Sequence, residues 1–280
     1  MQKRIFLLFL VVVLLLVGGG TISFAAPPVE RAYAWYFKRT PDHSAPPLPP
    51  EFSFLYETDG YYLDPCPPEG DKVLYLTFDA GYENGNIAKI LDTLAAHHAI
   101  GAFFILENLI TREPDLVRRM AADGHTVCNH TAHHKDMTRL GKAAFCAELD
   151  ALAESYQTLT GSAIAPFYRP PEGRFTRENL EWAKEMGYKT IFWSFAYADW
   201  DNNRQPDTEK ALEKLSANLH NGEVLLLHPT SATNAAVLDA FLTHAEREGY
   251  RFGTLAELCS RTLPHEMWRT PSHCLPDENV

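Results

Sequence analysis

The sequence has few basic residues, few cysteines and no internal repeat. Its 280 residues include 25 Lys and Arg against 36 Asp and Glu, a formal net charge of −11. The chain thus lacks the basic stripe of a nucleic-acid-binding protein, so we expect no nucleic acid as partner. No pair among the 5 cysteines has metal-finger spacing, which argues against a cysteine-based zinc site. In an exported protein Cys259 could pair with Cys274, although buried or unpaired thiols fit the sequence equally well.

The first 26 residues have the layout of a secretory signal. Lys3 and Arg4 precede an apolar run at residues 5–17, and small residues end the segment near Ala25. The run is shorter than the roughly 20 apolar residues of a membrane span, but residues 18–26 could extend it into an uncleaved anchor. We predict a signal peptide or N-terminal anchor at residues 1–26. The protein would then act outside the cytoplasm, at the cell wall, and would contact the membrane only through this segment.

Residues 27–70 contain several Pro-Pro pairs. Proline-rich sequence of this kind predicts either a linker or an irregular arm that packs against the following domain. Aromatic residues such as Trp35 and Phe52 argue against complete disorder.

From residue 72 onward, short apolar runs alternate with amphipathic stretches. The apolar runs predict buried strands at 73–78, 102–106, 126–129, 167–169, 189–194, 223–227 and 250–253. Helical spacing and capping residues predict helices at 86–98, 114–123, 142–159, 176–186, 208–220 and 234–248. This α/β order predicts about seven parallel strands in a closed or nearly closed barrel over residues 71–262, with a tail at 263–280. An open doubly wound sheet is the alternative.

Reactive side chains follow several of these strands. Asp79, His130, Arg169 and His228 lie at or just past strand ends, and Asp199 lies a few residues beyond the strand at 189–194. The carboxyl ends of parallel strands share one edge, where active sites of such folds are built. We therefore expect these groups to meet at one rim.

A carboxylate and two imidazoles in this set are suited to metal-assisted hydrolysis. Asp79 could act as a general base, or simply cap the following turn. His130 and His134 are four residues apart, a spacing that puts both rings on one face of a helical turn and suits a zinc site. His133 and His125 compete for this role, and a catalytic zinc usually needs a third protein ligand.

The remaining groups would support acid–base chemistry. Two prolines follow Arg169, so a rigid guanidinium could orient Asp79 through paired hydrogen bonds. Asp199 could accept a hydrogen bond from a histidine ring and raise its pKa. His228 ends an apolar strand and faces the same rim, which favours it as the general acid. Taken alone, Arg169 would more often be a surface residue before a turn, and His228 a structural residue at a strand end.

Taken together, the clusters resemble the polysaccharide deacetylase family, also called the NodB homology domain or carbohydrate esterase family 4. The resemblance covers roughly residues 70–258. It is closest to the branch of peptidoglycan N-acetylmuramic acid deacetylases. The motifs that carry it are Thr-Phe-Asp-Ala-Gly-Tyr-Glu-Asn-Gly at 77–85, Arg-Pro-Pro-Glu-Gly at 169–173 and Trp-Ser-Phe-Ala-Tyr-Ala-Asp-Trp at 193–200.

The resemblance implies a distorted (β/α) barrel and a role for each residue. Asp79 would be the catalytic base and His228 the general acid, with Arg169 and Asp199 orienting and tuning them. His130 and His134 would bind a divalent metal such as Zn²⁺, Mn²⁺ or Co²⁺. The implied substrate contacts are Trp200, Leu225, Tyr82, Pro171 and Glu172, and a backbone N–H in the turn at 171–173 would stabilise the oxyanion.

The sequence departs from the family pattern at Ala80. Most members have a metal-binding Asp at this position, so the resemblance implies weaker metal binding here, with water or substrate completing the coordination. The implied function is exported de-N-acetylation of N-acetylmuramic acid in peptidoglycan, which prepares muramic δ-lactam in spore cortex. One alternative is a deacetylase of N-acetylglucosamine or chitin oligomers. Another is a wall-binding module that has lost catalysis, and a cytosolic small-molecule amidohydrolase is disfavoured by the export segment.

Overall fold

The computed structural model describes residues 31–40 and 43–260. Its strands are β1 (Tyr33–Ala34), β2 (Gly60–Tyr61), β3 (Lys72–Ala80), β4 (Gly101–Ile105), β5 (Thr126–Asn129), β6 (Ala165–Tyr168), β7 (Arg174–Phe175), β8 (Lys189–Ile191), β9 (Glu223–Leu227) and β10 (Tyr250–Phe252). Its helices are α1 (Ile87–Ala96), α2 (Glu107–Arg112), α3 (Pro114–Ala122), α4 (Lys142–Thr160), α5 (Arg177–Glu185), α6 (Thr208–Asn218), α7 (Ala232–Arg247) and α8 (Leu255–Ser260). All the predicted strands and helices are present to within a few residues. The sequence did not predict the short elements β1, β2, β7, α2 and α8.

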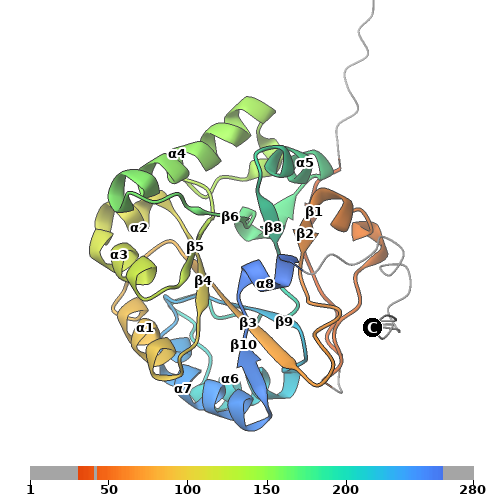
Figure 1. Cartoon of the computed structure of the whole chain (residues 1–280), viewed down its shortest axis with the longest axis vertical. Helices are drawn as coiled ribbons and strands as arrows, with labels where there is room; N and C mark the ends of the chain where they lie inside the picture. Colours follow the sequence, from red (N-terminus) through yellow and green to blue (C-terminus); the bar gives the residue numbers. More distant parts are fainter. Residues whose placement is uncertain (1–30, 41–42, 261–280) are drawn as a thin grey trace, which may run out of the picture. The chain divides into compact units, whose positions relative to one another are not determined.

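The main sheet is parallel throughout and curls on itself. Its strand order is β10-β3-β4-β5-β6-β8-β2, and β9 pairs with β3. Just past β8, the N–H of Ser194 donates to Val224 (3.0 Å), and the N–H of Leu226 donates to Phe195 (3.0 Å). These bonds join the two ends of the strand series, and helices surround the strands (Figure 1). The distorted barrel is therefore confirmed, and the open doubly wound alternative is wrong.

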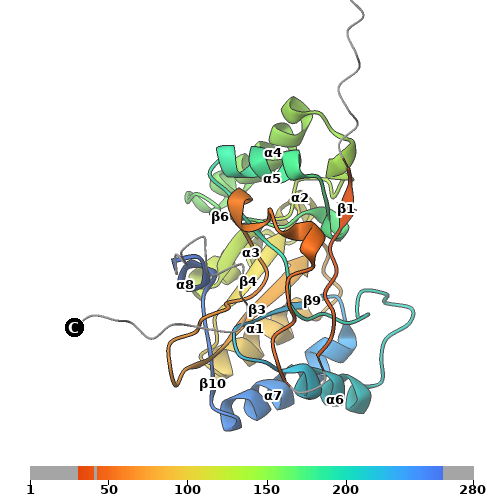
Figure 2. The same ribbon diagram turned by 90° about the vertical axis from the view of Figure 1, so that its right-hand side faces the viewer.

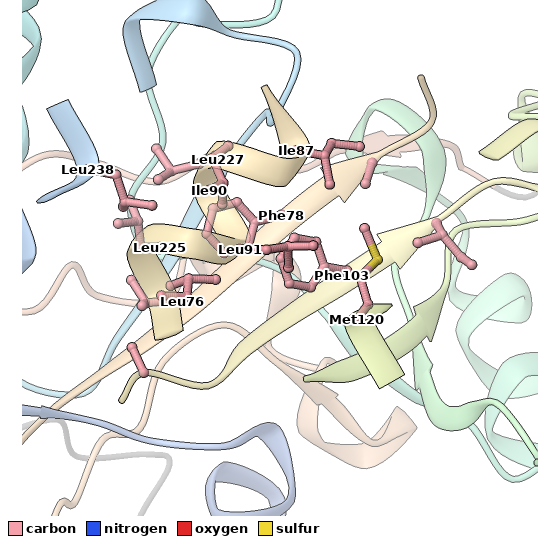
Figure 3. Close-up of a cluster of buried hydrophobic side chains, with 14 of the residues drawn as sticks. Leu76, Phe78, Ile87, Ile90, Leu91, Phe103, Met120, Leu225, Leu227 and Leu238 are labelled. Carbon is pink, nitrogen blue, oxygen red and sulfur yellow. The ribbon is translucent and has the colours of Figure 1, made fainter. Parts of the chain in front are cut away.

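Along β3 and β9, alternate side chains face the hydrophobic core and the barrel interior. Leu76 pairs with Leu225 and Phe78 with Leu227 across β3 and β9. These four side chains are buried against residues of α1 and α7 (Figure 3). Burial of one such side chain contributes about 1.5–3 kcal/mol. Because successive residues of a strand face opposite sides, Thr77 and its neighbours in register face the barrel interior.

The proline-rich arm is part of the same compact unit as the barrel, from Arg31 onward. Strand β1 pairs with β7, and β2 extends the main sheet beside β8. Trp35 stacks on Phe192 with ring centroids 4.5 Å apart, inside an aromatic cluster shared by arm and barrel. The described part of residues 27–70 is therefore an arm that packs against the barrel, and the domain boundary at residue 71 stays a prediction. The segments 1–26 and 263–280 lie outside the described residues.

The cysteines do not form the pair that the sequence analysis considered. Cys259 is a free, buried thiol whose pKa burial raises to about 12, so a Cys259–Cys274 disulfide is wrong; Cys274 itself lies outside the described residues. Cys128 and Cys146 are also free, whereas Cys66 is disulfide-bonded. Within residues 31–40 and 43–260, no helix combines the length and apolar character needed to cross a membrane.

Candidate active site

The base side of the site is built from β3 and the segment that follows β6. Asp79 lies near the end of β3, and Arg169 follows β6 with its side chain fully buried. Arg169 Nη1 donates to Asp79 Oδ1 at 2.8 Å. Its Nη2 donates instead to Thr77 Oγ1 at 3.0 Å, and its Nε donates to the carbonyl of Ile191 at 2.9 Å. The expected paired bonds to Asp79 are therefore wrong, because Thr77 lies on the same strand face and takes the second donor.

The electrostatics of this side keep Asp79 ionised. Burial alone would raise the pKa of the carboxyl, but the charges of Arg169 and His228 and the hydrogen bond from Arg169 outweigh it and lower the pKa. The guanidinium is itself stabilised by the face of Phe104, whose ring centroid lies 4.1 Å away. A buried, ionised carboxylate with one oxygen held by Arg169 leaves its other oxygen for proton transfer.

The two histidines meet through a loop rather than a helical turn. His130 and His134 lie between β5 and α4, with ring centroids 5.0 Å apart. Thr131 and His134 have φ values of 73° and 53°, which no α-helix contains. The loop is held by Asn129, which accepts from the N–H of Thr131 at 2.9 Å, and by Thr131 Oγ1, which accepts from the N–H of His134 at 3.0 Å. The helical basis of the prediction is therefore wrong, although the rings do meet.

The competing histidines do not join this pair. His133 bonds to Glu148 of α4, with its N–H 3.0 Å from Oε2 and Nδ1 3.1 Å from Oε1. His125 accepts a hydrogen bond from the N–H of Gly101 at 3.1 Å, beside the Phe103 ring. Glu148 thus anchors the loop to α4 and leaves His130 and His134 facing the site.

His130 is prepared as a nitrogen ligand. Its Nδ1 lies 2.9 Å from the carbonyl of Arg169, which can only accept, so Nδ1 carries the proton and Nε2 holds a lone pair. Burial lowers the pKa of His130 to about 4, so the ring is neutral. Nε2 lies 3.6 Å from Asp79 Oδ2. Two lone pairs face each other there, an arrangement that a cation would satisfy.

These donors fit a divalent ion held by two imidazoles. Among the described residues, no three His, Cys, Asp or Glu side chains group closely enough to hold a metal without further ligands. Ala80 is fully buried in the hydrophobic cluster with Phe78 and Ile87, so its side chain faces the core. A metal at His130 and His134 would therefore depend on water or substrate for its remaining ligands.

The acid side is built from the loop after β8 and the residue after β9. His228 Nδ1 donates to Asp199 Oδ1 at 2.7 Å, and the His228 N–H donates to Asp199 Oδ2 at 2.8 Å. Asn234 of α7 donates to the same Oδ2 at 2.6 Å. Burial would lower the pKa of His228, but the hydrogen bond and charge of Asp199 outweigh it and raise the pKa. The ring therefore favours the protonated form, with Nε2–H available as a donor.

Both sides open into one cavity of about 1030 Å³. Asp79, His130, His134 and His228 all line it, so the predicted groups share one rim. Other lining residues come from the arm, from β9 and from the surrounding loops, and they include Phe37, Arg39, Tyr82, Leu106, Glu172, Gly173, Trp193, Tyr197, Trp200, Asn202, Leu226 and Thr230. The residues Tyr82 and Trp200 are each 63% exposed, which is unusual for aromatic residues and suits stacking on a sugar.

Two predicted substrate contacts do not line this cavity. Leu225 is fully buried in the hydrophobic cluster (Figure 3), and its neighbour Leu226 lines the cavity instead. The reason is strand alternation, which turns Leu225 toward the helices and Leu226 toward the interior. Pro171 is buried, and the adjacent Glu172 and Gly173 reach the cavity in its place.

Several supporting residues escaped the sequence analysis. Thr77 accepts a hydrogen bond from Arg169, and Asn234 donates one to Asp199. Phe37 and Arg39 line the cavity from the arm. Thr77 falls within a motif of the predicted site, two residues before Asp79 on the same strand face, which could have pointed to it. For Asn234, Phe37 and Arg39 the sequence carries no comparable signal, because their positions depend on packing between distant segments.

Comparison with known proteins identifies relatives of this architecture. The family model for polysaccharide deacetylase matches residues 67–191. The chain is 36% identical over 225 residues to the peptidoglycan-N-acetylmuramic acid deacetylase PdaA of Bacillus subtilis, covering 80% of this chain and 84% of that protein. It is 28% identical over 196 residues to a peptidoglycan-N-acetylglucosamine deacetylase of Bacillus cereus, covering 68% and 90%.

A solved structure shows the same fold. The structure of B. subtilis PdaA, described as a family 4 carbohydrate esterase, superposes with a TM-score of 0.78 at 36% identity, covering 83% of this chain and 98% of that one. The sequence identity, the shared barrel and the gathered acid–base groups lead to one conclusion. The chain belongs to the polysaccharide deacetylase family, carbohydrate esterase family 4.

Proposed function

We propose that this enzyme removes the acetyl group from N-acetylmuramic acid in peptidoglycan, outside the cytoplasm. The observation that carries the proposal is the placement of a carboxylate with a lowered pKa and an imidazole with a raised pKa on one cavity. Environments that separate two pKa values in this way assign the base and the acid. The choice of muramic acid is supported by the 36% identity to a protein named for that substrate.

In the proposed reaction, a water attacks the acetyl carbonyl while Asp79 takes its proton. His228 then protonates the sugar nitrogen through Nε2, the C–N bond breaks, and acetate and a free amine leave. Arg169 keeps Asp79 ionised and oriented, and Asp199 does the same for the protonated ring. Proton transfer by a positioned side chain contributes about 10²–10⁴-fold to rate.

The oxyanion requires a hydrogen-bond donor at the cavity wall. In the turn Pro171–Gly173, proline has no N–H, and the N–H of Gly173 already donates to Pro170 at 3.0 Å. The N–H of Glu172, a residue with φ of 55° that lines the cavity, is therefore the remaining donor of this turn. Preorganised N–H groups are effective for this purpose because they need no reorganisation during the reaction.

A divalent ion such as Zn²⁺, Mn²⁺ or Co²⁺ would be held by His130 and His134, and when bound it would polarise the carbonyl and lower the pKa of a coordinated water. The lone pair on His130 Nε2 and the neighbouring His134 ring support this role. With few side-chain ligands, the ion is expected to bind weakly and to exchange readily. Tyr82 and Trp200 would contact neighbouring sugar rings. The apolar segment at residues 5–17 supports export or anchoring, and preparation of muramic δ-lactam in spore cortex would follow from the freed amine.

The test is acetate release by purified protein, with and without each metal, from two substrates. One is a peptidoglycan glycan stripped of peptide, which contains N-acetylmuramic acid, and the other is a chitin oligomer. We expect release from the first. Equal or greater release from chitin oligomers would point to the N-acetylglucosamine alternative. Glycan binding without acetate release under any metal would instead point to a wall-binding module.

A further inference from the structure

One positively charged side chain lines the active-site cavity, and the proposed reaction does not use it. Among the described residues that line the cavity, Arg39 is the only Lys or Arg. Its guanidinium lies 5.7 Å from the ring centroid of Phe195 and forms no ion pair with any residue that the structure describes. Glu172 lines the same cavity without pairing to it. Arg39 is exposed, so its guanidinium donors are open to solvent and to a ligand in the cavity.

The arm brings Arg39 to the cavity through a series of fixed contacts. The N–H of Trp35 donates to Gly173 at 2.8 Å, and its indole Nε1 donates to Trp193 at 2.9 Å. Phe37 then packs edge-on against Phe195, with centroids 6.0 Å apart. Trp35 and Phe37 are more buried than Tyr36 between them, whereas Arg39 is exposed, and Figure 2 shows the segment running from β1 toward α6. Arg39 is therefore positioned by the aromatic anchors that precede it.

The substrate chemistry supplies a matching anion. Muramic acid differs from glucosamine by a lactyl ether on the ring carbon next to the acetamide-bearing carbon, and this ether ends in a carboxylate when no peptide is attached. An acetamide placed between Asp79 and His228 therefore brings the carboxylate into the same cavity. Arginine is the side chain best suited to carboxylates, because its planar donors form paired, charge-assisted hydrogen bonds.

We propose that Arg39 binds the lactyl carboxylate of muramic acid and thereby makes the enzyme select muramic acid over glucosamine. This inference rests on the proposed function. It assigns specificity to the N-terminal arm rather than to the barrel. Because the contact is made to substrate before and during the reaction alike, Arg39 acts mainly on KM.

The experiment compares wild-type protein with Arg39→Ala, Arg39→Lys and the control Lys38→Ala. Lys38 is exposed like its neighbour Arg39, but it does not line this cavity. For the peptide-free muramyl glycan, we expect Arg39→Ala to lower kcat/KM about 10- to 100-fold through KM, the range for a hydrogen bond to a charged group. Arg39→Lys should retain part of the activity, and Lys38→Ala all of it. Activity of each variant on chitin oligomers should match that of wild-type protein.

A third substrate, the muramyl glycan with its lactyl carboxylate converted to an amide, isolates the contact. On this amide glycan, kcat/KM of wild-type protein should fall by the same factor by which Arg39→Ala lowers kcat/KM on the glycan with a free carboxylate. An equal loss of Arg39→Ala on all three substrates, or no loss on the acid, would overturn the inference. Failure of wild-type protein to act on any muramyl glycan would instead refute the proposed function.

Discussion

On both the base side and the acid side of the cavity, a charged partner outweighs the effect of burial on a pKa, and the two pKa values move in opposite directions. On the base side, burial would raise the pKa of Asp79, and the charge of Arg169 is the largest influence that reverses this. On the acid side, burial would lower the pKa of His228, and the hydrogen bond and charge of Asp199 reverse it. Each shift therefore favours the charged form of its group. The difference shows that the buried partner, rather than burial itself, decides which group gives and which takes a proton.

The two sides also differ in construction. Asp79 and Arg169 are held at strand ends, with the guanidinium also bound to Thr77 and to backbone carbonyls of the β8 segment. Asp199 belongs to the loop after β8 and is fixed mainly by His228 and Asn234. The base side thus lies at strand ends, whereas the acid side joins a loop to the end of β9 and to the start of α7.

Removal of either titrating group should have the largest effect. Asp79→Asn and His228→Gln should each reduce kcat by about 10²–10⁴-fold, because each removes one proton-transfer step. The pH profiles should separate them. Activity falls at low pH as Asp79 is protonated, and at high pH as His228 loses its proton. The profile of Asp79→Asn should therefore lack the acid limb, and that of His228→Gln the alkaline limb. An Asp79→Asn protein within a few-fold of wild type would contradict the base assignment.

Asp199→Asn should have a smaller effect, restricted to the acid side. Without its main charge partner, His228 would lose the influence that raises its pKa, and burial would lower it. We expect the alkaline limb of kcat against pH to move to lower pH, while the acid limb stays in place because Asp79 keeps Arg169. A shift of both limbs, or of neither, would show that the two sides are not independently tuned.

The smallest expected effect is on stability. The raised pKa of folded His228 means that its charged form contributes stability that is fully present below the ordinary value of 6.5 and is lost as pH rises through the folded pKa. Asp79 behaves oppositely, because its lowered pKa gives stability that is present above 3.8 and lost as pH falls through the folded pKa. Thermal unfolding across alkaline pH should therefore show a weaker pH dependence for His228→Gln than for wild-type protein. Identical dependence would contradict the folded-state shift.

Local patterns were sufficient for the main elements and for the general location of the chemistry. Apolar runs between turn residues identified the strands of the barrel, because a parallel strand buried on both faces must be apolar. The same runs located Asp79, Arg169 and His228 at strand ends. Short elements such as β2 and α2 were missed because their few residues carry no periodicity.

Details of the site required the fold. The His130 and His134 rings meet through a loop with two positive φ values, which the four-residue spacing cannot indicate. Leu225 and Leu226 are indistinguishable in an apolar run, and only the register of β9 against β3 decides which one faces the cavity.

By itself, the sequence determined the α/β order, the barrel strands and the types of residue available for amide hydrolysis, since these depend on local periodicity and on side-chain chemistry. The tertiary structure alone decided the pKa of each group, the single bond between Arg169 and Asp79, and the entry of Arg39 into the cavity. These depend on distances between segments far apart in the chain. Because electrostatic and hydrogen-bond energies change steeply with distance and burial, no local pattern can encode them.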